Sequence, residues 1–100
     1  MAKVLIVFAH PDPRSFNGAL LRTAQETLAG AGHEVRVSDL YAMGFDPVAR
    51  GSDFKTYDEA QPLDYFGEQK RAWPAGTLAD DIVAEIDKIA WCDLVILQFP

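Results

Sequence analysis

The residues best suited to chemistry lie in one short polar turn, which runs His10-Pro11-Asp12-Pro13-Arg14-Ser15-Phe16-Asn17-Gly18-Ala19 after the first apolar run. Ser15 and Asn17 carry short polar side chains that can cap a helix or donate hydrogen bonds to a phosphate. His10 can donate to a phosphate or to a ring carbonyl, and Gly18 allows the backbone to approach a ligand closely. The turn predicts an anion-binding site; the alternative is that Ser15 is only a helix cap and His10 only a strand-end residue.

The turn does not match the common nucleotide-binding motifs. It has no G-x-G-x-x-G pattern and no Walker-type lysine, so it is neither a dinucleotide fingerprint nor a P-loop. A second feature, Gln98-Phe99-Pro100, ends the last apolar run. Pro100 can set a turn against which a flat ring stacks, although a strand terminator is the simpler interpretation.

Other reactive side chains are better explained as structural. Cys92 is the single cysteine, and a lone cysteine is more often a small core residue than a nucleophile. His10 and His33 are too isolated to predict a metal site. The acidic run Asp80–Asp87 is typical of the solvated face of a helix. No catalytic residue is identified from these patterns.

Alternating strands and helices must position the turn. Lys3–His10 is continuously apolar, which indicates a strand covered on both faces. Leu21, Ala24, Leu28 and Ala31 then recur at helical spacing, and Gly30 and Gly32 close that helix. Glu34–Leu40 alternates as a second strand nearer an edge, and Asp93–Phe99 predicts a third. Between them, Thr77 is expected to start a second helix with Asp80 in a capping-box position and an apolar stripe of Leu78, Ile82, Ile86 and Ile89.

This order of elements predicts an α/β fold with three parallel strands and two main helices. Alternating units of this kind imply right-handed crossovers, and the expected strand order is 2-1-3. The turn at His10 and the strand end at Gln98 would then be neighbours at the switch point of the sheet, where open α/β sheets bind ligands.

The segment Tyr41–Gly76 has no clear periodicity but holds 7 of the 11 aromatic residues. Disordered linkers are poor in aromatic residues, so we expect an ordered excursion that packs on something, including a partner chain. The strongly apolar third strand would leave an exposed edge in a sheet of three strands. Residues 1–100 are therefore expected to be the N-terminal part of a single, longer domain.

Composition limits the classes of partner. The apolar fraction of 49% and the charged fraction of 24% are ordinary for a globular domain. The net charge of −6 argues against nucleic acid and against an anionic membrane surface, but it does not exclude a small anionic ligand. No apolar window is long enough for membrane insertion, and the first run is too short for a signal peptide, so a cytoplasmic protein is expected.

The chain resembles the flavodoxin-like NAD(P)H:quinone oxidoreductases of the DT-diaphorase type. The similarity spans nearly the whole chain in order. The matching pieces are Leu5-Ile6-Val7-Phe8-Ala9-His10, Ser15-Phe16-Asn17, Ser38-Asp39-Leu40-Tyr41-Ala42-Met43-Gly44-Phe45-Asp46-Pro47, Asp81-Ile82-Val83-Ala84-Glu85 and Asp93-Leu94-Val95-Ile96-Leu97-Gln98-Phe99-Pro100.

The resemblance implies a flavoenzyme that transfers two electrons from NAD(P)H through its flavin to a quinone. The cofactor would be FAD, or FMN in some branches, and the enzyme would be a homodimer. By resemblance, the phosphate and ribityl region would be held by His10, Ser15, Phe16 and Asn17, with Ala19 close by, and Pro100 would begin the loop that cradles the flavin ring. Family members can use a glutamine toward the flavin near the middle of the long segment, whereas this sequence has Asp64 near that position, so it departs from the family there. The residues credited in the family with assisting hydride transfer lie outside this sequence.

Three alternatives remain open from the sequence. Some close relatives act as regulatory flavoprotein subunits of potassium-efflux transporters. A one-electron flavodoxin-like carrier is a second alternative, although flavodoxins typically have a Thr/Ser-rich first loop. The third is that residues 1–100 alone are an inactive fragment.

Overall fold

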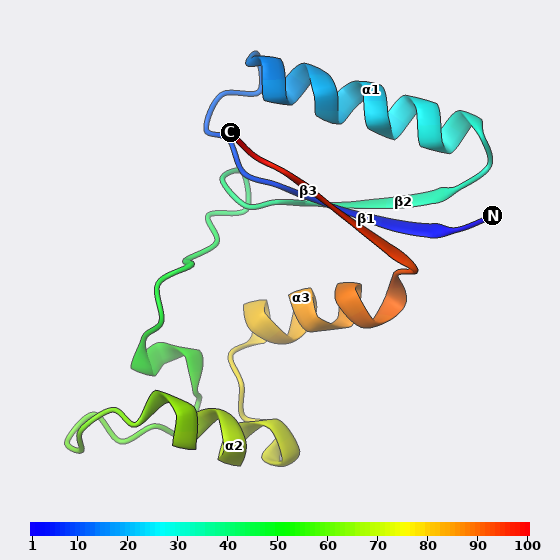
Figure 1. Cartoon of the computed structure of the whole chain (residues 1–100). Helices are drawn as coiled ribbons and strands as arrows, with labels where there is room; N and C mark the ends of the chain where they lie inside the picture. The colour runs from blue at the N-terminus through cyan, green and yellow to red at the C-terminus, as the bar shows by residue number, and fades with distance from the viewer. The chain divides into compact units, whose positions relative to one another are not determined.

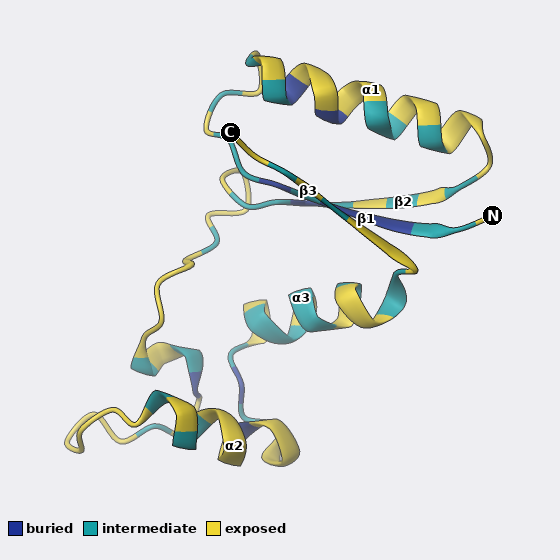
Figure 2. Cartoon of the chain, in the orientation of Figure 1, coloured by how far each residue is buried: buried dark blue, intermediate teal, exposed yellow.

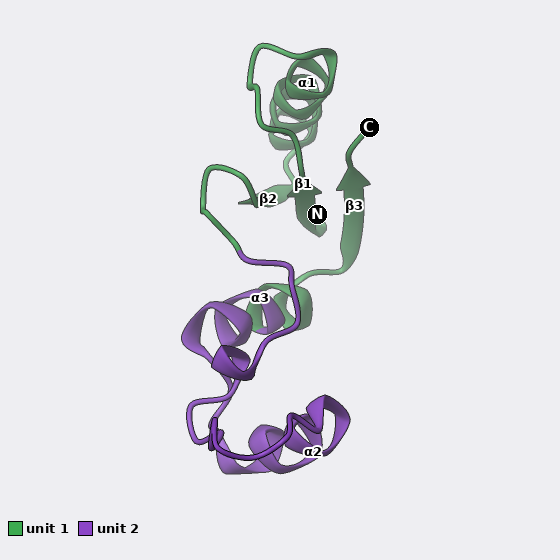
Figure 3. Ribbon diagram, turned by 90° about the vertical axis from the view of Figure 1, so that its left-hand side faces the viewer, with its two compact units in different colours: residues 1–45, 87–100 green, residues 46–86 purple.

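The computed structural model describes all residues, 1–100, and contains seven elements (Figure 1). In chain order these are β1 (Lys3–Phe8), α1 (Phe16–Gly30), β2 (Glu34–Asp39), the short 3₁₀ helix η1 (Gly51–Asp53), α2 (Tyr65–Ala75), α3 (Asp80–Trp91) and β3 (Leu94–Gln98). The chain divides into two compact units (Figure 3). The first comprises residues 1–45 and 87–100, and the second comprises residues 46–86.

The first unit is built on a sheet of three parallel strands in the order β2-β1-β3. Ile6 at the middle of β1 lies opposite Val37 of β2 and Ile96 of β3. The predicted fold class and strand order are confirmed. The continuous apolar run Val4–Phe8 explains the central place of β1, because a strand flanked on both edges and covered on both faces favours apolar side chains at every position.

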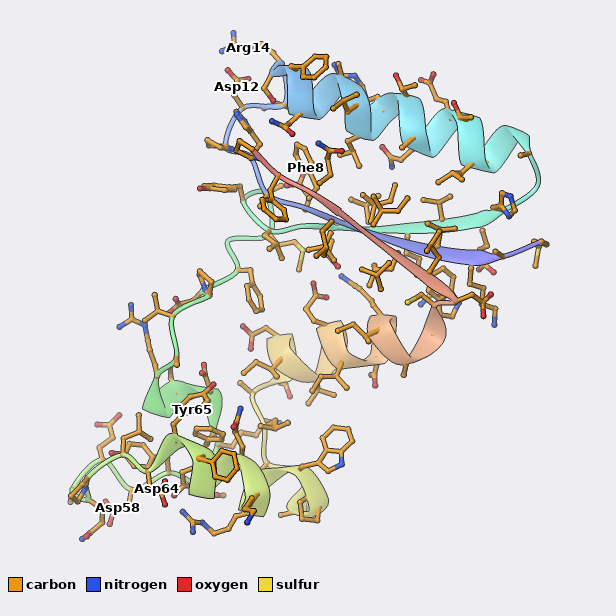
Figure 4. All side chains as sticks on the ribbon, viewed as in Figure 1. Phe8, Asp12, Arg14, Asp58, Asp64 and Tyr65 are labelled. Carbon is orange, nitrogen blue, oxygen red and sulfur yellow. The ribbon has the colours of Figure 1, made fainter.

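The core of the first unit lies between β1 and α1. Val4, Ile6 and Phe8 of β1 share one face of the sheet and pack with Leu21 of α1. Figure 4 shows Phe8 between the sheet and α1. Alternation sends Leu5 to the opposite face, where only 1% of it is exposed. Burial on both faces suits the central place of β1, and the chain leaves the carboxyl end of this strand toward the polar turn.

The last turn of α3 is held to β2 on the face opposite α1 (Figure 1). The Lys88 Nζ atom donates to the Oγ atom of the buried Ser38 at 3.2 Å. The Arg36 guanidinium lies 4.2 Å from the centre of the Trp91 ring, a cation–π contact. These contacts cover the second face of the sheet next to the point where β3 begins.

The aromatic segment forms most of the second unit and contains η1 and α2. Its core consists of Phe54, Ala72 and Leu78, and the ring of Phe54 meets that of Tyr65 edge-on at 4.9 Å. Helix α2 was not predicted, because Pro74 and Gly67 interrupt a stretch with only one buried residue, Ala72. The ends define this helix instead: the Asp64 carboxylate accepts from the Gly67 N–H at its start, and Gly76 is left-handed at its end.

The predicted start of the next helix at Thr77 is wrong, because α3 begins at Asp80. Residues 77–79 are extended instead and pair with residues 53–55 through a bridge between Phe54 and Leu78. The Lys55 N–H donates to the Thr77 carbonyl at 2.7 Å, and the Ala79 N–H donates to the Asp53 carbonyl at 2.8 Å. Leu78 therefore reaches the core from a short ladder. Ile89, which was expected to lie on the apolar face of this helix, is 58% exposed, so this part of the prediction is also wrong.

The outer edge of β3 is uncovered. Leu94, Val95 and Leu97 are exposed, and the strand hydrogen-bonds only to β1 (Figure 2). This agrees with the apolar edge that the sequence predicts for a three-stranded sheet. None of the helices combines the length and the apolar character needed to cross a membrane.

Replacement of Tyr65 by phenylalanine is expected to change how the second unit responds to alkaline pH. The Tyr65 hydroxyl donates to Asp53 Oδ2 at 2.6 Å, and this hydrogen bond, with a smaller effect of burial, raises the pKa of Tyr65 from 10.0 to about 12. The fold therefore prefers the neutral phenol. Its contribution to stability is complete below pH 10 and is lost as the pH rises through about 12.

The measurement is urea unfolding of the wild type, Tyr65→Phe and the control Tyr41→Phe, whose ring is exposed and has no hydrogen-bond partner. We expect Tyr65→Phe to be less stable at neutral pH and the difference from wild type to shrink between pH 10 and 12. A constant difference across this range would contradict the assigned hydrogen bond.

Candidate functional site

The polar turn lies where the carboxyl ends of β1 and β3 meet the start of α1. The Ala9 N–H donates to the Gln98 carbonyl at 3.1 Å, which continues the pairing of β1 with β3. The Gln98 Nε2 atom donates to Asn17 Oδ1 at 2.6 Å. The two features that the sequence singles out, the turn and the end of the third strand, are therefore brought together at the switch point.

Ser15 caps α1 and leaves donors available beside it. Its Oγ atom accepts from the Gly18 N–H at 3.0 Å, so the hydroxyl proton remains free to donate elsewhere. The backbone N–H groups of Phe16 and Asn17 have no acceptor within the chain. No acidic side chain lies in the first turn of α1, and the positive end of the helix dipole is not neutralised there. This group of donors suits an anion.

The His10 ring is fixed by the backbone of the turn. Its Nδ1 atom accepts from the Asp12 N–H at 2.9 Å and also lies 3.1 Å from the Asp12 carbonyl oxygen. Accepting at Nδ1 places the proton of the neutral ring on Nε2. With Nδ1 accepting from the Asp12 N–H, the Nε2–H group is left as a hydrogen-bond donor.

The middle of the turn rests directly on the helix. A Cβ atom on Gly18 would lie 2.2 Å from the Pro13 carbonyl oxygen, so only glycine fits at this position. The same oxygen accepts from Arg22 Nη1 at 2.7 Å. Gly18 is thus needed for the close approach of two backbone segments, which holds the turn over the N-terminus of α1.

Asp12 brings a negative charge to the turn, and Arg14 offsets it. The Arg14 guanidinium contacts both carboxylate oxygens at 3.1 Å, and its backbone N–H donates to Oδ1 at 2.9 Å. These hydrogen bonds lower the pKa of Asp12. Both side chains point away from the sheet at the start of α1 (Figure 4). The ion pair reduces the repulsion that a bare carboxylate would exert on an anionic ligand.

The other predicted site residues lie around this group. Phe16 and Ala19 are exposed on the first turn of α1, and Pro100 is exposed just beyond the end of β3. Asp64 belongs to the second unit and caps α2. Gln98 was named as a strand-end feature but not as a site residue; the signal was a single uncharged polar side chain at the carboxyl end of an apolar strand.

No other place in the chain gathers comparable chemistry. No group of three or more His, Cys, Asp or Glu side chains could hold a metal ion. A cavity of about 260 Å³ in the second unit is lined by Thr56, Tyr57, Asp58, Gln61, Pro62, Glu68, Arg71 and Thr77. Two of its three charged side chains, Glu68 and Arg71, already pair with each other at 2.5 Å. The polar turn is the best candidate site.

The sequence is similar to that of a protein family and of several named proteins. A protein family described as having a flavodoxin-like fold matches residues 2–100. The ribosyldihydronicotinamide dehydrogenase [quinone] of Homo sapiens is 44% identical over 99 residues, covering 98% of this chain and 43% of its own length. The NAD(P)H dehydrogenase [quinone] 1 of Cavia porcellus is 40% identical over 101 residues, covering all of this chain and 37% of its own length.

A solved structure is also close. The crystal structure of a candidate quinone reductase from Klebsiella pneumoniae superposes with a TM-score of 0.89 at 45% identity, over 100% of this chain and 39% of that protein. The chain thus spans about two fifths of the length of the proteins it matches.

Proposed function

We propose that this chain, which belongs to the family with a flavodoxin-like fold, carries the phosphate-binding part of a flavin site in an NAD(P)H:quinone oxidoreductase. The reaction would transfer two electrons from NAD(P)H to a quinone. FAD is the proposed cofactor, with FMN as the alternative.

The observation that carries the proposal is the set of unpaired donors at the start of α1. The Ser15 hydroxyl, the Nδ2 group of Asn17, the Nε2–H of His10 and the N–H groups of Phe16 and Asn17 have no acceptor within the chain. A phosphate offers several oxygen acceptors of full negative charge, which such donors bind best. The missing Cβ of Gly18 keeps the turn close to the helix. The residues therefore fit the phosphate side of a flavin.

These residues would bind and orient the cofactor, while a bound flavin supplies the hydride-transfer chemistry. Ser15 and Asn17 would hold the phosphate at the positive end of α1. His10 would donate from the end of β1 toward the phosphate and ribityl region. Ala19 leaves room beside the helix, and Pro100 would direct the backbone beyond β3 around the ring. No residue of this chain is assigned a catalytic role.

The proposal includes further partners of the whole protein. A quinone or a similar small acceptor and NAD(P)H would be its substrates, and the relatives' names support both. We also propose a homodimer that works in the cytoplasm. The exposed rings of Phe66 and Trp73 on α2, which are 70% and 63% exposed, support an interface on the second unit.

The first test is the absorption spectrum of the purified protein, followed by NAD(P)H oxidation with and without a quinone. Bound flavin and quinone-dependent oxidation are expected. Purified protein that neither retains nor takes up FAD or FMN would overturn the proposal. Flavin binding without quinone reduction would favour the regulatory-subunit alternative, which a measurement of transporter-mediated potassium efflux would then test.

Replacement of His10 by alanine is expected to weaken flavin binding more than it weakens the fold. The ring is half-buried and makes its hydrogen bonds only to the backbone of its own turn, so its loss removes one ligand donor and little packing. Flavin affinity from fluorescence quenching and the melting temperature of the apoprotein check this expectation. A large drop in the apoprotein melting temperature with unchanged affinity would contradict the assigned role.

A further inference from the structure

Gln98 and Asn17 form a hydrogen bond between distant parts of the sequence within the candidate site. Gln98 Nε2 donates to Asn17 Oδ1 at 2.6 Å between residues 81 positions apart. Both side chains are half-buried. The backbone of Gln98 is itself fixed, because its carbonyl accepts from the Ala9 N–H at 3.1 Å. Asn17 therefore meets a side chain whose backbone is anchored to β1.

The hydrogen bond decides which way the Asn17 carboxamide faces. Asparagine presents an acceptor oxygen and a donor NH₂ group on the two sides of one plane. Since Gln98 binds the oxygen, the NH₂ group faces away from Gln98, and it has no acceptor within the chain. In the opposite orientation the oxygen would face the ligand, and an acceptor repels an anion. Only the observed orientation adds donors to those of Ser15 and the helix N-terminus.

We infer that Gln98 is a positioning residue of the flavin site, which orients the Asn17 carboxamide so that it donates to the anionic part of the cofactor. The inference rests on the proposed function, since it explains what orients the Asn17 carboxamide within the proposed flavin site. Gln98 acts through Asn17 and need not contact the ligand. The competing explanation is that the hydrogen bond only fastens β3 to α1, with no effect on which group Asn17 presents.

Gln98→Glu separates these explanations. A carboxylate has the size of the carboxamide but cannot donate, so Asn17 must turn its NH₂ group toward the introduced carboxylate to keep a hydrogen bond. The link between β3 and α1 is then preserved while the Asn17 oxygen faces the ligand. The negative charge of the new side chain also repels an anion directly. The same replacement in the Asn17→Ala background measures this direct electrostatic effect by itself. Gln69→Glu, at an exposed position on α2, controls for the change in net charge.

The experiment measures the dissociation constant of FAD for the wild type, Gln98→Glu, Asn17→Ala and the double variant. We expect Gln98→Glu to weaken binding by roughly tenfold to a hundredfold more when Asn17 is present than when alanine replaces it, as for the loss of a hydrogen bond to a charged group. Gln69→Glu should bind as the wild type does. An equal effect of Gln98→Glu in both backgrounds would overturn the inference.

A second readout does not depend on flavin. In the apoprotein, the side-chain NH₂ protons of Gln98 should exchange slowly with water and those of Asn17 quickly, and in Gln98→Glu the Asn17 protons should become protected. Fast exchange of the Gln98 protons, or unchanged Asn17 exchange in the variant, would overturn the assigned orientation. Failure of the wild type to bind FAD while the exchange pattern holds would overturn the proposed function and leave the orientation of Asn17 established.

Discussion

Gly18→Ala is expected to destabilise the protein and to disrupt the candidate site. The added methyl group would stand 2.2 Å from the Pro13 carbonyl oxygen, which belongs to the backbone and cannot rotate away. Either the turn or the helix must shift, and overpacking of this kind costs roughly 1–3 kcal/mol. Because the turn carries His10 and Ser15, its displacement should also weaken flavin binding. Chemical unfolding and flavin titration measure the two effects.

Gly30→Ala is the matched control for this replacement. Gly30 ends α1, and a Cβ atom there would meet nothing within 4 Å. Alanine is about 1 kcal/mol more favourable than glycine inside a helix, so the control should be as stable as the wild type or more stable. Equal behaviour of the two variants would show that the turn is not held against Gly18, and the structural account of the site would fail.

Removing both polar side chains at the start of α1 should nearly abolish flavin retention. Ser15→Ala and Asn17→Ala each delete a donor to the phosphate, and a hydrogen bond to a charged group contributes about 1.5–3 kcal/mol. The double variant is therefore expected to lose more than about a hundredfold in affinity. Flavin content after purification and the dissociation constant of added FAD provide the measurement.

The fold should be affected less than binding in these variants. Ser15 is the N-cap of α1, and its loss costs about 1 kcal/mol of stability, whereas Asn17 loses only its hydrogen bond to Gln98. Thr23→Ala, in an exposed position on α1, controls for the change in helix propensity. Unchanged flavin content in the double variant would refute the role given to the turn.

The apolar patterns determined the sheet because they are local consequences of burial. A run such as Val4–Phe8 has no polar face and must be central, and the alternation in Glu34–Asp39 marks an edge. The second unit was harder to predict. Helix α2 depends on caps at its two ends, and the short ladder at Leu78 depends on pairing with Phe54, which is distant in sequence. Propensity could not reveal that pairing, so the start of α3 was placed too early.

The sequence by itself predicted where the proposed site of this protein lies, because a polar turn with a helix cap after a central parallel strand has one place in such a fold. The tertiary structure decided how the donors are arranged. The closeness of Pro13 to Gly18 and the hydrogen bond from Gln98 to Asn17 join groups whose contact depends on the packing of α1 and β3 onto β1. The physical reason is that the orientation of a side-chain amide is fixed by its hydrogen-bond partner, and here that partner is distant in the sequence.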